Sequence, residues 1–585
     1  MKRLLMSRVP TKKQLRHLPK VLSQKERRLM MILFWVAVIS ILSLPVTSYI
    51  HFTKSVPDDG GSMVEGLIGT PKHINPLLSQ GNDADGDLVS LIFPGLVKYA
   101  GNGKINGDLA ESYHISDDGL VYTFVLRRDL LWHDGHALTA DDVIFTIFTV
   151  QNADYGSSQR ILWQGIEVSK IDSLTVAFKL KNKYAQFIGN ATLGILPKHI
   201  WENIKPVNFG LSEFNLKPVG SGPYKFSKIR RDTFGNIKSF ELAAFDKHHA
   251  GRPHVSKLTF KFYPSEADLV EGYENNEIDG FSSISASGLS SIRFLGQLKL
   301  EKLSLPRYFA AFFNQNHSKP LADKSVRMAL SYATDKNGLV EKILSGNGVV
   351  VDSPMMPGII DLPDDTEKYS FDLELAKKTL EDAGWKYPVS VSAEGSFREK
   401  AAPTPKTKNE KQGESVKLEI RLTTSDWPEL ITAAEQIKKQ WEAVGVRVRV
   451  EILPLPELQQ AIKAREYDAL LFGEVLALDP DPFSFWHSSQ KRDPGLNLAL
   501  YDSKDADKLL EDARQTLDRS ARLSKYDDFQ KIIVKDIPAI FLYSPDYLYA
   551  QPSKIKGNDT KIISIPSDRF NTVSNWYIET KRVRK

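Results

Sequence analysis

The chain has 585 residues, of which 42% are hydrophobic and 25% charged, a balance typical of folded globular domains. It contains no cysteine, which excludes disulfides, thiolate metal sites, thiol catalysis and a lipid anchor on cysteine. The net charge of +5 comes from the chain ends, because residues 29–580 hold 63 basic and 71 acidic residues. Since nucleic-acid binding needs a basic face on the folded body, the sequence predicts no nucleic-acid partner.

The N-terminal region joins a basic segment to an apolar one. Residues 1–28 carry ten Lys or Arg and one acid, and residues 29–50 are uncharged. A helix of that length is long enough to cross a hydrocarbon core about 30 Å thick. The positive-inside rule then predicts a cytoplasmic segment 1–28, a single-pass anchor 29–50 in the cell membrane and an extracytoplasmic remainder. The alternative is a cleaved signal peptide, with residues 46–48 as a poor cleavage site.

The segment after the apolar stretch, residues 51–62, is polar and predicts a short tether. Beyond it the chain shows mixed patterns. Residues 120–126 form a β-rich run, and residues 139–151 begin with Thr139 and Asp142 in a capping-box variant, which predicts a helix.

Three later segments have clear periodicity. An apolar stripe predicts a helix over 325–344, and Asp372 can cap a helix that ends before Gly384. Residues 416–453 read as strand, helix and strand, which predicts an α/β lobe. Between these segments, residues 393–415 contain almost no large apolar side chain and predict a disordered surface insertion.

Two motifs suggest chemistry at first sight. His133 and His136 enclose Asp134-Gly135, a pair that favours a turn with surface histidines over a metal site. Residues 219–224 are rich in glycine but lack the lysine of a P-loop and the third glycine of a dinucleotide fingerprint. The sequence therefore predicts no enzyme and no cofactor or metal.

Several segments follow one another in a recognisable order. They are LAES (109–112), SDDGLVYTFVLRRDLLWHDGHALTADDVIFT (116–146), ILPKHIW (195–201), PVGSGPYKF (218–226), LAKKTLEDAGW (375–385) and Asp479-Pro480. From about residue 62 to about residue 570 the chain resembles the family 5 extracellular solute-binding proteins, the dipeptide and oligopeptide receptors of ABC importers.

The resemblance implies an α/β, periplasmic-binding-protein-like fold with two lobes and three domains around a ligand cleft. Domain I would comprise residues 60–85, 219–305 and 540–585. Domain II would be 86–218 and domain III 306–539. The cleft would close over its ligand by hinge bending and hold an extended peptide mainly through the peptide backbone.

Two stretches match the family's ligand-lining positions. The first is Val64, Glu65 and Gly66, and the second comprises Gly473, Glu474, Val475, Leu476 and Asp479. The family pattern has an Asp, which pairs with the peptide's α-ammonium, where this chain has Leu476. The expected substitutes for that anion are Glu474 and Glu65.

The resulting prediction is a monomeric extracytoplasmic receptor that captures a solute and delivers it to ABC permease subunits. The expected solute is an oligopeptide. One alternative keeps the scaffold but binds another solute, such as a sugar, a metal or a haem complex. The other alternative is a surface or signalling receptor without transport.

Overall fold

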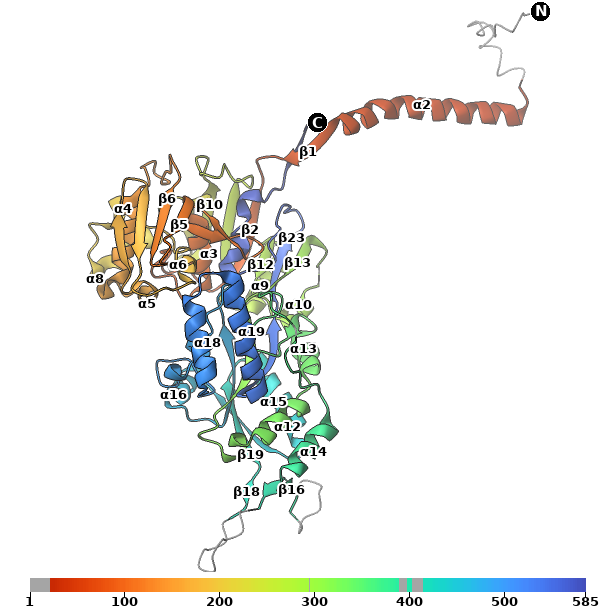
Figure 1. Ribbon diagram of the computed structural model, residues 1–585. Helices are drawn as coiled ribbons and strands as arrows, with labels where there is room; N and C mark the ends of the chain where they lie inside the picture. Colours follow the sequence, from red (N-terminus) through yellow and green to blue (C-terminus); the bar gives the residue numbers. More distant parts are fainter. Residues whose placement is uncertain (1–21, 294, 364, 389–396, 402–413) are drawn as a thin grey trace, which may run out of the picture. The chain divides into compact units, whose positions relative to one another are not determined.

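The computed structural model describes residues 22–293, 295–363, 365–388, 397–401 and 414–585 (Figure 1). By the clustering of its contacts the chain divides into two compact units. One unit is Met1–Asp59 with Glu579–Lys585, and the other is Gly60–Ile578.

In its described residues, the smaller unit contains a long helix and a two-stranded sheet. Helix α2 (Gln24–Phe52) begins where Glu26 accepts the backbone N–H of Ser23 at 2.9 Å. Strand β1 (Thr53–Pro57) pairs antiparallel with β24 (Thr580–Arg584). The predicted tether 51–62 therefore has to be corrected, because part of it is a strand whose partner lies at the other end of the chain.

Helix α2 is long and apolar enough to cross a membrane, and none of its apolar span is buried. A signal sequence near an N-terminus has the same properties. The apolar segment predicted from the sequence is thus helical, and its length fits both a membrane anchor and a signal sequence.

The larger unit contains a seven-stranded sheet in the order β13-β23-β12-β2-β11-β10-β9. In β11 the side chains of Leu258, Phe260 and Phe262 alternate with less buried ones and face the core. The strands are β2 (Ser62–Ile68), β9 (Tyr224–Arg231), β10 (Ile237–Ala244), β11 (Lys257–Tyr263), β12 (Gly280–Ser282), β13 (Leu298–Leu303) and β23 (Tyr547–Pro552). Helices α3 (Asp83–Ile92), α9 (Glu266–Glu274) and α10 (Ala286–Ser291) accompany this sheet.

A four-stranded antiparallel sheet, in the order β5-β6-β8-β7, shares one hydrophobic core with the seven-stranded sheet. Phe124 and Phe178 of the smaller sheet belong to the same cluster as Phe240 and Phe260 of the larger one. Its strands are β5 (Ala110–Ile115), β6 (Val121–Leu126), β7 (Glu167–Lys170) and β8 (Thr175–Lys179), and β3 (Val97–Tyr99) pairs with β4 (Ile105–Gly107) nearby in the sequence. The helices are α4 (Ala140–Gln151), α5 (Arg160–Trp163), α6 (Phe187–Asn190), α7 (Lys198–Trp201) and α8 (Pro206–Phe209).

A six-stranded sheet, in the order β15-β22-β14-β21-β19-β20, forms the other lobe. Strand β14 is buried on both faces, since Phe309 and Phe313 pack in one cluster and Tyr308 and Phe312 in another. The strands are β14 (Arg307–Phe313), β15 (Gly348–Val350), β19 (Glu419–Ser425), β20 (Arg447–Leu453), β21 (Ala469–Val475) and β22 (Ala539–Pro545). Because β22 belongs to this sheet, the predicted domain boundary at residue 540 is wrong by one strand, and the three-domain division as a whole stays a prediction.

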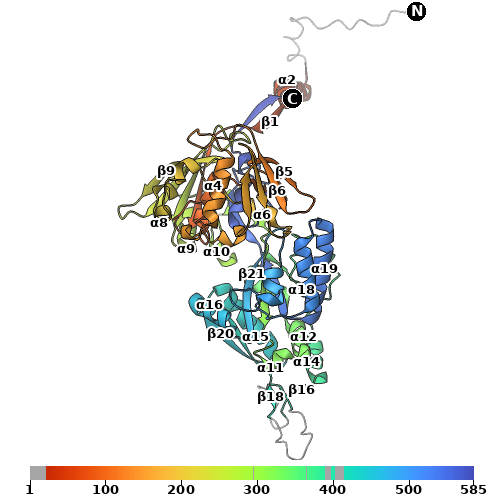
Figure 2. The ribbon, with the colours of Figure 1, turned by 60° about the vertical axis from the view of Figure 1, so that its left-hand side comes forward.

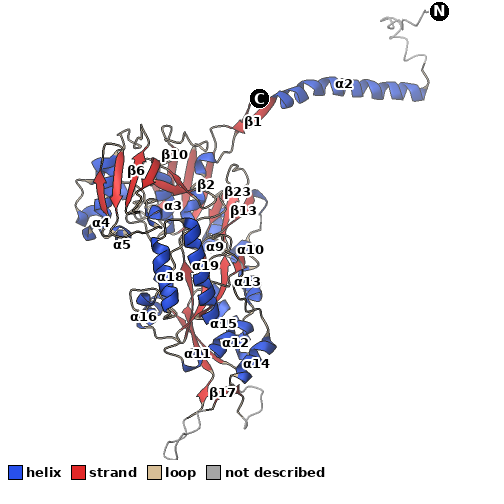
Figure 3. Ribbon diagram, in the orientation of Figure 1, coloured by secondary structure: helices blue, strands red, loops and turns tan. Residues whose placement is uncertain are grey.

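The helices of the six-stranded lobe are mostly amphipathic. Figure 3 shows α18 and α19 as two neighbouring helices, and their residues are in contact. The set comprises α11 (Lys319–Ala322), α12 (Lys324–Ala333), α13 (Lys336–Leu344), α14 (Leu373–Asp382), α15 (Pro428–Glu442), α16 (Leu455–Ala464), α17 (Phe483–Trp486), α18 (Lys504–Gln515) and α19 (Arg519–Asp536). The single helix expected over 325–344 is in fact two, because the Asp335 side chain accepts the N–H of Gly338 and starts a new helix.

A small three-stranded sheet lies near α14 in Figure 2 and consists of β16 (Trp385–Lys386), β17 (Glu399–Lys400) and β18 (Val416–Lys417). Strand β17 falls inside the insertion 393–415 that was expected to be disordered, so this prediction is wrong for residues 397–401. Arg398 is only 2% exposed and donates to the carbonyls of Val444 and Trp385 at 2.8 and 3.0 Å. Residues 393–396 and 402–413 lie outside the described part of the chain.

Candidate functional site

A cavity of about 530 Å³ lies where the seven-stranded and six-stranded sheets meet. The chain crosses between these sheets twice here: residues 304–306 link β13 to β14, and Asp546 links β22 to β23. Both sides of the crossing contribute to the lining. The lining includes Asp83 on one side and Arg307, Phe309, Lys342, Trp427, Glu429, Tyr543 and Asp546 on the other.

Arg307 is the most unusual residue of this lining. It begins β14, its backbone is in register with Val475, and its guanidinium carbon lies 5.8 Å from the ring centre of Phe309. Its Nε is buried without a hydrogen-bond partner, and no ion pair involves Arg307 among the described residues. Burial lowers the pKa of Arg307 below its usual value, but a guanidinium remains charged in proteins.

A second unsatisfied group lies beside this guanidinium. The hydroxyl of Tyr543 is buried and has no hydrogen-bond partner in the described part of the chain, and its ring centre is 5.5 Å from that of Phe309. Burial raises the pKa of Tyr543, so the hydroxyl keeps its proton and remains a donor. Since buried polar groups are normally paired, Arg307 and Tyr543 together form a donor pair that a ligand could satisfy.

Acidic side chains also face the cavity. Asp83 and Glu429 interact electrostatically with Arg307 without forming an ion pair with it. Asp546 lines the cavity at the crossing between the sheets, and burial raises its pKa. The cavity therefore presents a cation and separate anions, an arrangement that suits a ligand carrying charges of both signs.

A second cavity, of about 420 Å³, shares Asp83 and Pro566 with the first. Its lining includes Gln80, Gly81 and Asn82, just before α3. Asn82 caps that helix by accepting the N–H of Ala84 at 3.1 Å, and it donates to the carbonyl of Thr70 at 3.0 Å. The two hydrogen bonds of Asn82 thus fix the segment 80–83, whose last residue lines both cavities.

The site residues predicted on β2 line neither cavity. The backbone N–H of Val64 donates to Asp279 Oδ2 at 2.8 Å. Glu65 is 2% exposed and forms an ion pair with Arg569 at 3.2 Å. A side chain at Gly66 would lie 2.4 Å from Ile278 Cδ1, so core packing explains this glycine.

The site residues predicted around β21 line neither cavity either. Gly473 packs on Phe309, and Leu476 is 4% exposed within the core. Val475 is exposed beside Arg307, and Asp479 accepts from Arg522 Nη2 at 2.9 Å.

Glu474 is buried where it was expected to offer an anion. The Tyr308 hydroxyl donates to one of its carboxyl oxygens, and the other oxygen has no partner among the described residues. Burial raises the pKa of Glu474 to about 8, so it is largely protonated at neutral pH. Glu474 is therefore buried and protonated and Glu65 is paired with Arg569, so their role as substitutes for an Asp at 476 stays a prediction that this structure does not favour.

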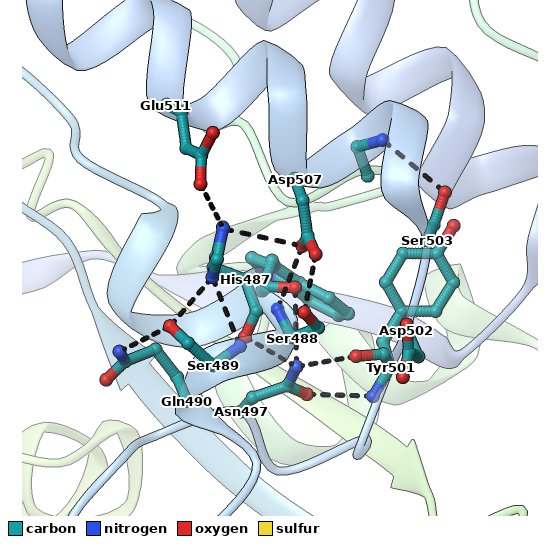
Figure 4. A network of polar contacts seen from close by, with 12 residues as sticks. His487, Ser488, Ser489, Gln490, Asn497, Tyr501, Asp502, Ser503, Asp507 and Glu511 are labelled. Atoms are coloured by element: carbon teal, nitrogen blue, oxygen red, sulfur yellow. Dashed lines mark hydrogen bonds and ion pairs between the residues drawn. The ribbon is translucent and has the colours of Figure 1, made fainter.

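A dense polar network around His487 has a structural explanation (Figure 4). His487 Nδ1 accepts the backbone N–H of Ser489 at 3.1 Å and so caps a short 3-10 turn. The other ring nitrogen lies 3.2 Å from Glu511 Oε1 on α18. The Ser489 hydroxyl lies 2.7 Å from Nδ1, but the lone pair of this nitrogen already accepts the backbone N–H of Ser489. The network links α17 to α18 and does not resemble an activated nucleophile.

The residues that sequence analysis missed left only weak signals. Arg307 is a single basic residue directly before the apolar run 308–313, and Gln80 to Asn82 precede a helix start. Neither pattern indicates that strands distant in the sequence meet at these positions. The cavity therefore follows only from the three-dimensional structure.

Comparisons with known proteins give a consistent result. The family profile described as "Bacterial extracellular solute-binding proteins, family 5 Middle" matches residues 104–495. The oligopeptide-binding protein AppA of Bacillus subtilis is 31% identical over 510 residues, which cover 86% of this chain and 89% of AppA. The dipeptide-binding protein of Escherichia coli is 25% identical over 538 residues, covering 87% of this chain and 94% of that protein.

A solved structure extends the comparison to the fold. The structure of AppA from Bacillus subtilis in complex with a nonapeptide matches with a TM-score of 0.67 and 28% identity. The match covers 90% of this chain and all of that one. The expected periplasmic-binding-protein-like α/β fold is thereby confirmed.

Proposed function

We propose that this chain, which belongs to family 5 of the bacterial extracellular solute-binding proteins, captures an oligopeptide outside the cytoplasm and delivers it to the permease of an ABC importer. The relatives support the peptide, because AppA and the Escherichia coli protein are named for oligopeptide and dipeptide binding. Delivery to a permease is proposed from the family alone. The expectation that the protein acts as a monomer also stays a prediction.

The observation that carries the proposal is the unpaired Arg307 in the cavity between the sheets. A buried guanidinium N–H without a hydrogen-bond partner is costly, and a ligand carboxylate would remove that cost. A free peptide brings one carboxylate and, at its other end, one ammonium. Arg307 and Tyr543 would donate to the carboxylate, and Asp83 or Glu429 would receive the ammonium.

The test is a fluorescence titration with tri- to nonapeptides in free and C-amidated forms. Trp427 lines the cavity and is 53% exposed, so a bound peptide should change its emission. Arg307→Met should weaken binding of the free peptides by about 2 kcal/mol or more, roughly thirtyfold, and affect the amidated forms much less. Lys342→Met is the matched control, because Lys342 lines the same cavity but is exposed and bonded to Gln436.

Two results would count against the proposal in different ways. Unchanged affinity in Arg307→Met would remove Arg307 from the site and leave peptide binding intact. If the wild-type protein binds no peptide in either form, the peptide proposal itself fails and another solute has to be sought.

We further propose that α2 is an uncleaved single-pass anchor with its N-terminal side in the cytoplasm. The ten basic residues before the apolar span and the length of the helix support this topology. The intact protein should stay with membranes in high salt, and external protease should remove the unit Gly60–Ile578. A mature protein that starts near Tyr49 would contradict the anchor and indicate a signal peptide.

A further inference from the structure

One histidine motif of the sequence is not used by solute binding. Residues 132–136 form a tight turn, closed by the N–H of Trp132 donating to the carbonyl of His136 at 2.8 Å. Gly135 has a φ of +94°, which allows the chain to reverse there. The turn brings Asp134 and His136 to the surface, next to His199 on α7. A third polar side chain, distant in sequence, thus completes a cluster that the motif alone did not show.

The geometry of this cluster is compact. Asp134 Oδ2 lies 2.8 Å from His199 Nε2, and Asp134 Oδ1 lies 3.1 Å from His136 Nδ1. One ligand atom from each of the three residues lies within 4.8 Å of the other two. The two imidazole rings are stacked with their centres 4.3 Å apart. In a tetrahedral site with bonds of about 2.0–2.2 Å, neighbouring ligand atoms are roughly 3.4 Å apart, so small side-chain rotations suffice.

The three side chains are accessible and have no competing partner among the described residues beyond a turn contact from the His136 backbone N–H to Asp134. Their exposed fractions are 29% for Asp134, 65% for His136 and 30% for His199. The neighbouring His133 behaves differently: its Nδ1 accepts the N–H of Gly220 and its Nε2 contacts the carbonyl of Gly222, so it serves the fold.

We propose that Asp134, His136 and His199 bind a divalent ion of the zinc class, with Zn²⁺, Ni²⁺ and Cu²⁺ as the chemically suitable ions. Two imidazole nitrogens and one carboxylate oxygen are a donor set that these ions prefer, whereas Mg²⁺ and Ca²⁺ prefer oxygen ligands alone. Three protein ligands leave a position open for water. The bound ion would link the turn 132–136 to α7, independently of the solute cavity.

The experiment is a calorimetric titration of the untagged, EDTA-treated protein with Zn²⁺ alone, and with Mg²⁺ as the negative control. The wild-type protein should bind one Zn²⁺ with micromolar or better affinity and melt at a higher temperature in its presence. His136→Ala should weaken Zn²⁺ binding at least tenfold and abolish the rise in melting temperature. His199→Ala should do the same. His114→Ala, which removes an exposed histidine elsewhere, should leave both unchanged.

Folding of the variants is checked separately by their melting temperature in EDTA, which should match that of the wild-type protein. His136 is the decisive position because its side chain is the most exposed of the three. Equal Zn²⁺ affinity in wild type and His136→Ala would overturn the site, as would the absence of any Zn²⁺ binding below millimolar concentration. Peptide affinity should be the same with and without Zn²⁺, so failure of the metal site and failure of peptide binding are distinguishable.

Discussion

At the scale of single residues, burial decides what a charged side chain can do. Glu65 and Arg569 illustrate one outcome, since the guanidinium pairs with Glu65 at 3.2 Å and with Asp87 at 2.6 Å. Glu474 illustrates another, since it is buried and, among the residues that the structure describes, has no cation in contact and only the Tyr308 hydroxyl as partner. Arg307 is the third case, a cation that lines a cavity and whose buried Nε has no partner within the described ranges. Only the last arrangement leaves a charge available to a ligand.

The burial of Glu474 predicts a specific pH dependence of stability. Its pKa rises from an ordinary 4.5 to about 8 on folding, so between these values the folded state holds a proton that the unfolded chain has released. The free energy of unfolding therefore falls as pH rises through this window. Glu474→Gln cannot ionise, and its stability relative to wild type should rise by a few kcal/mol, on the order of 1.4 kcal/mol per pKa unit, between pH 5 and pH 9.

Urea unfolding at several pH values measures this difference. Glu65, whose pKa burial raises to about 7, is present in both proteins and cancels in the comparison. The control is Glu457→Gln, at an exposed position on α16. A difference between wild type and Glu474→Gln that stays constant from pH 5 to pH 9 would show that Glu474 is ionised throughout.

At the scale of elements, sequence periodicity and capping residues correctly predicted helices and strands that depend on neighbouring residues. The helix expected at 139–151 is α4, and the strand, helix and strand expected at 416–453 are β19, α15 and β20. Sequence periodicity failed where a partner distant in the sequence, or a capping side chain, determines the secondary structure. Strand β17 is missing from the prediction because Phe397 is the one large apolar residue in the segment 393–415, yet the Arg398 side chain supplies packing. The stem of Arg398 is buried, and its guanidinium lies 4.5 Å from the ring centre of Tyr387.

Arg398→Met should accordingly destabilise the protein, because the carbonyls of Val444 and Trp385 would each lose a charged donor. The expected loss in the free energy of unfolding is about 2–4 kcal/mol, the range for breaking a buried polar network. Lys417→Met, at an exposed position of β18, is the matched control. Thermal or urea unfolding measures both, and equal stability of the two variants would show that Arg398 is dispensable.

At the scale of the whole molecule, the motifs were sufficient for the family and the fold, because a long ordered set of segments is specific. They did not point to the cavity between the two sheets. The predicted residues on β2 and β21 line neither cavity, whereas Arg307, Tyr543 and Glu429 come from β14, β22 and α15 and meet only where two sheets approach each other. A cavity of this kind depends on long-range packing, which periodicity and composition do not encode.

The most direct test of the central claim is to identify the solute that the protein carries. Residues 60–585, purified without denaturation, should be analysed by native mass spectrometry, followed by release and fragmentation of the bound species. We expect peptides with free C-termini in the wild-type protein and a much lower occupancy in Arg307→Met. A sugar, a haem or a metal complex in the wild-type protein, with no peptide, would contradict it.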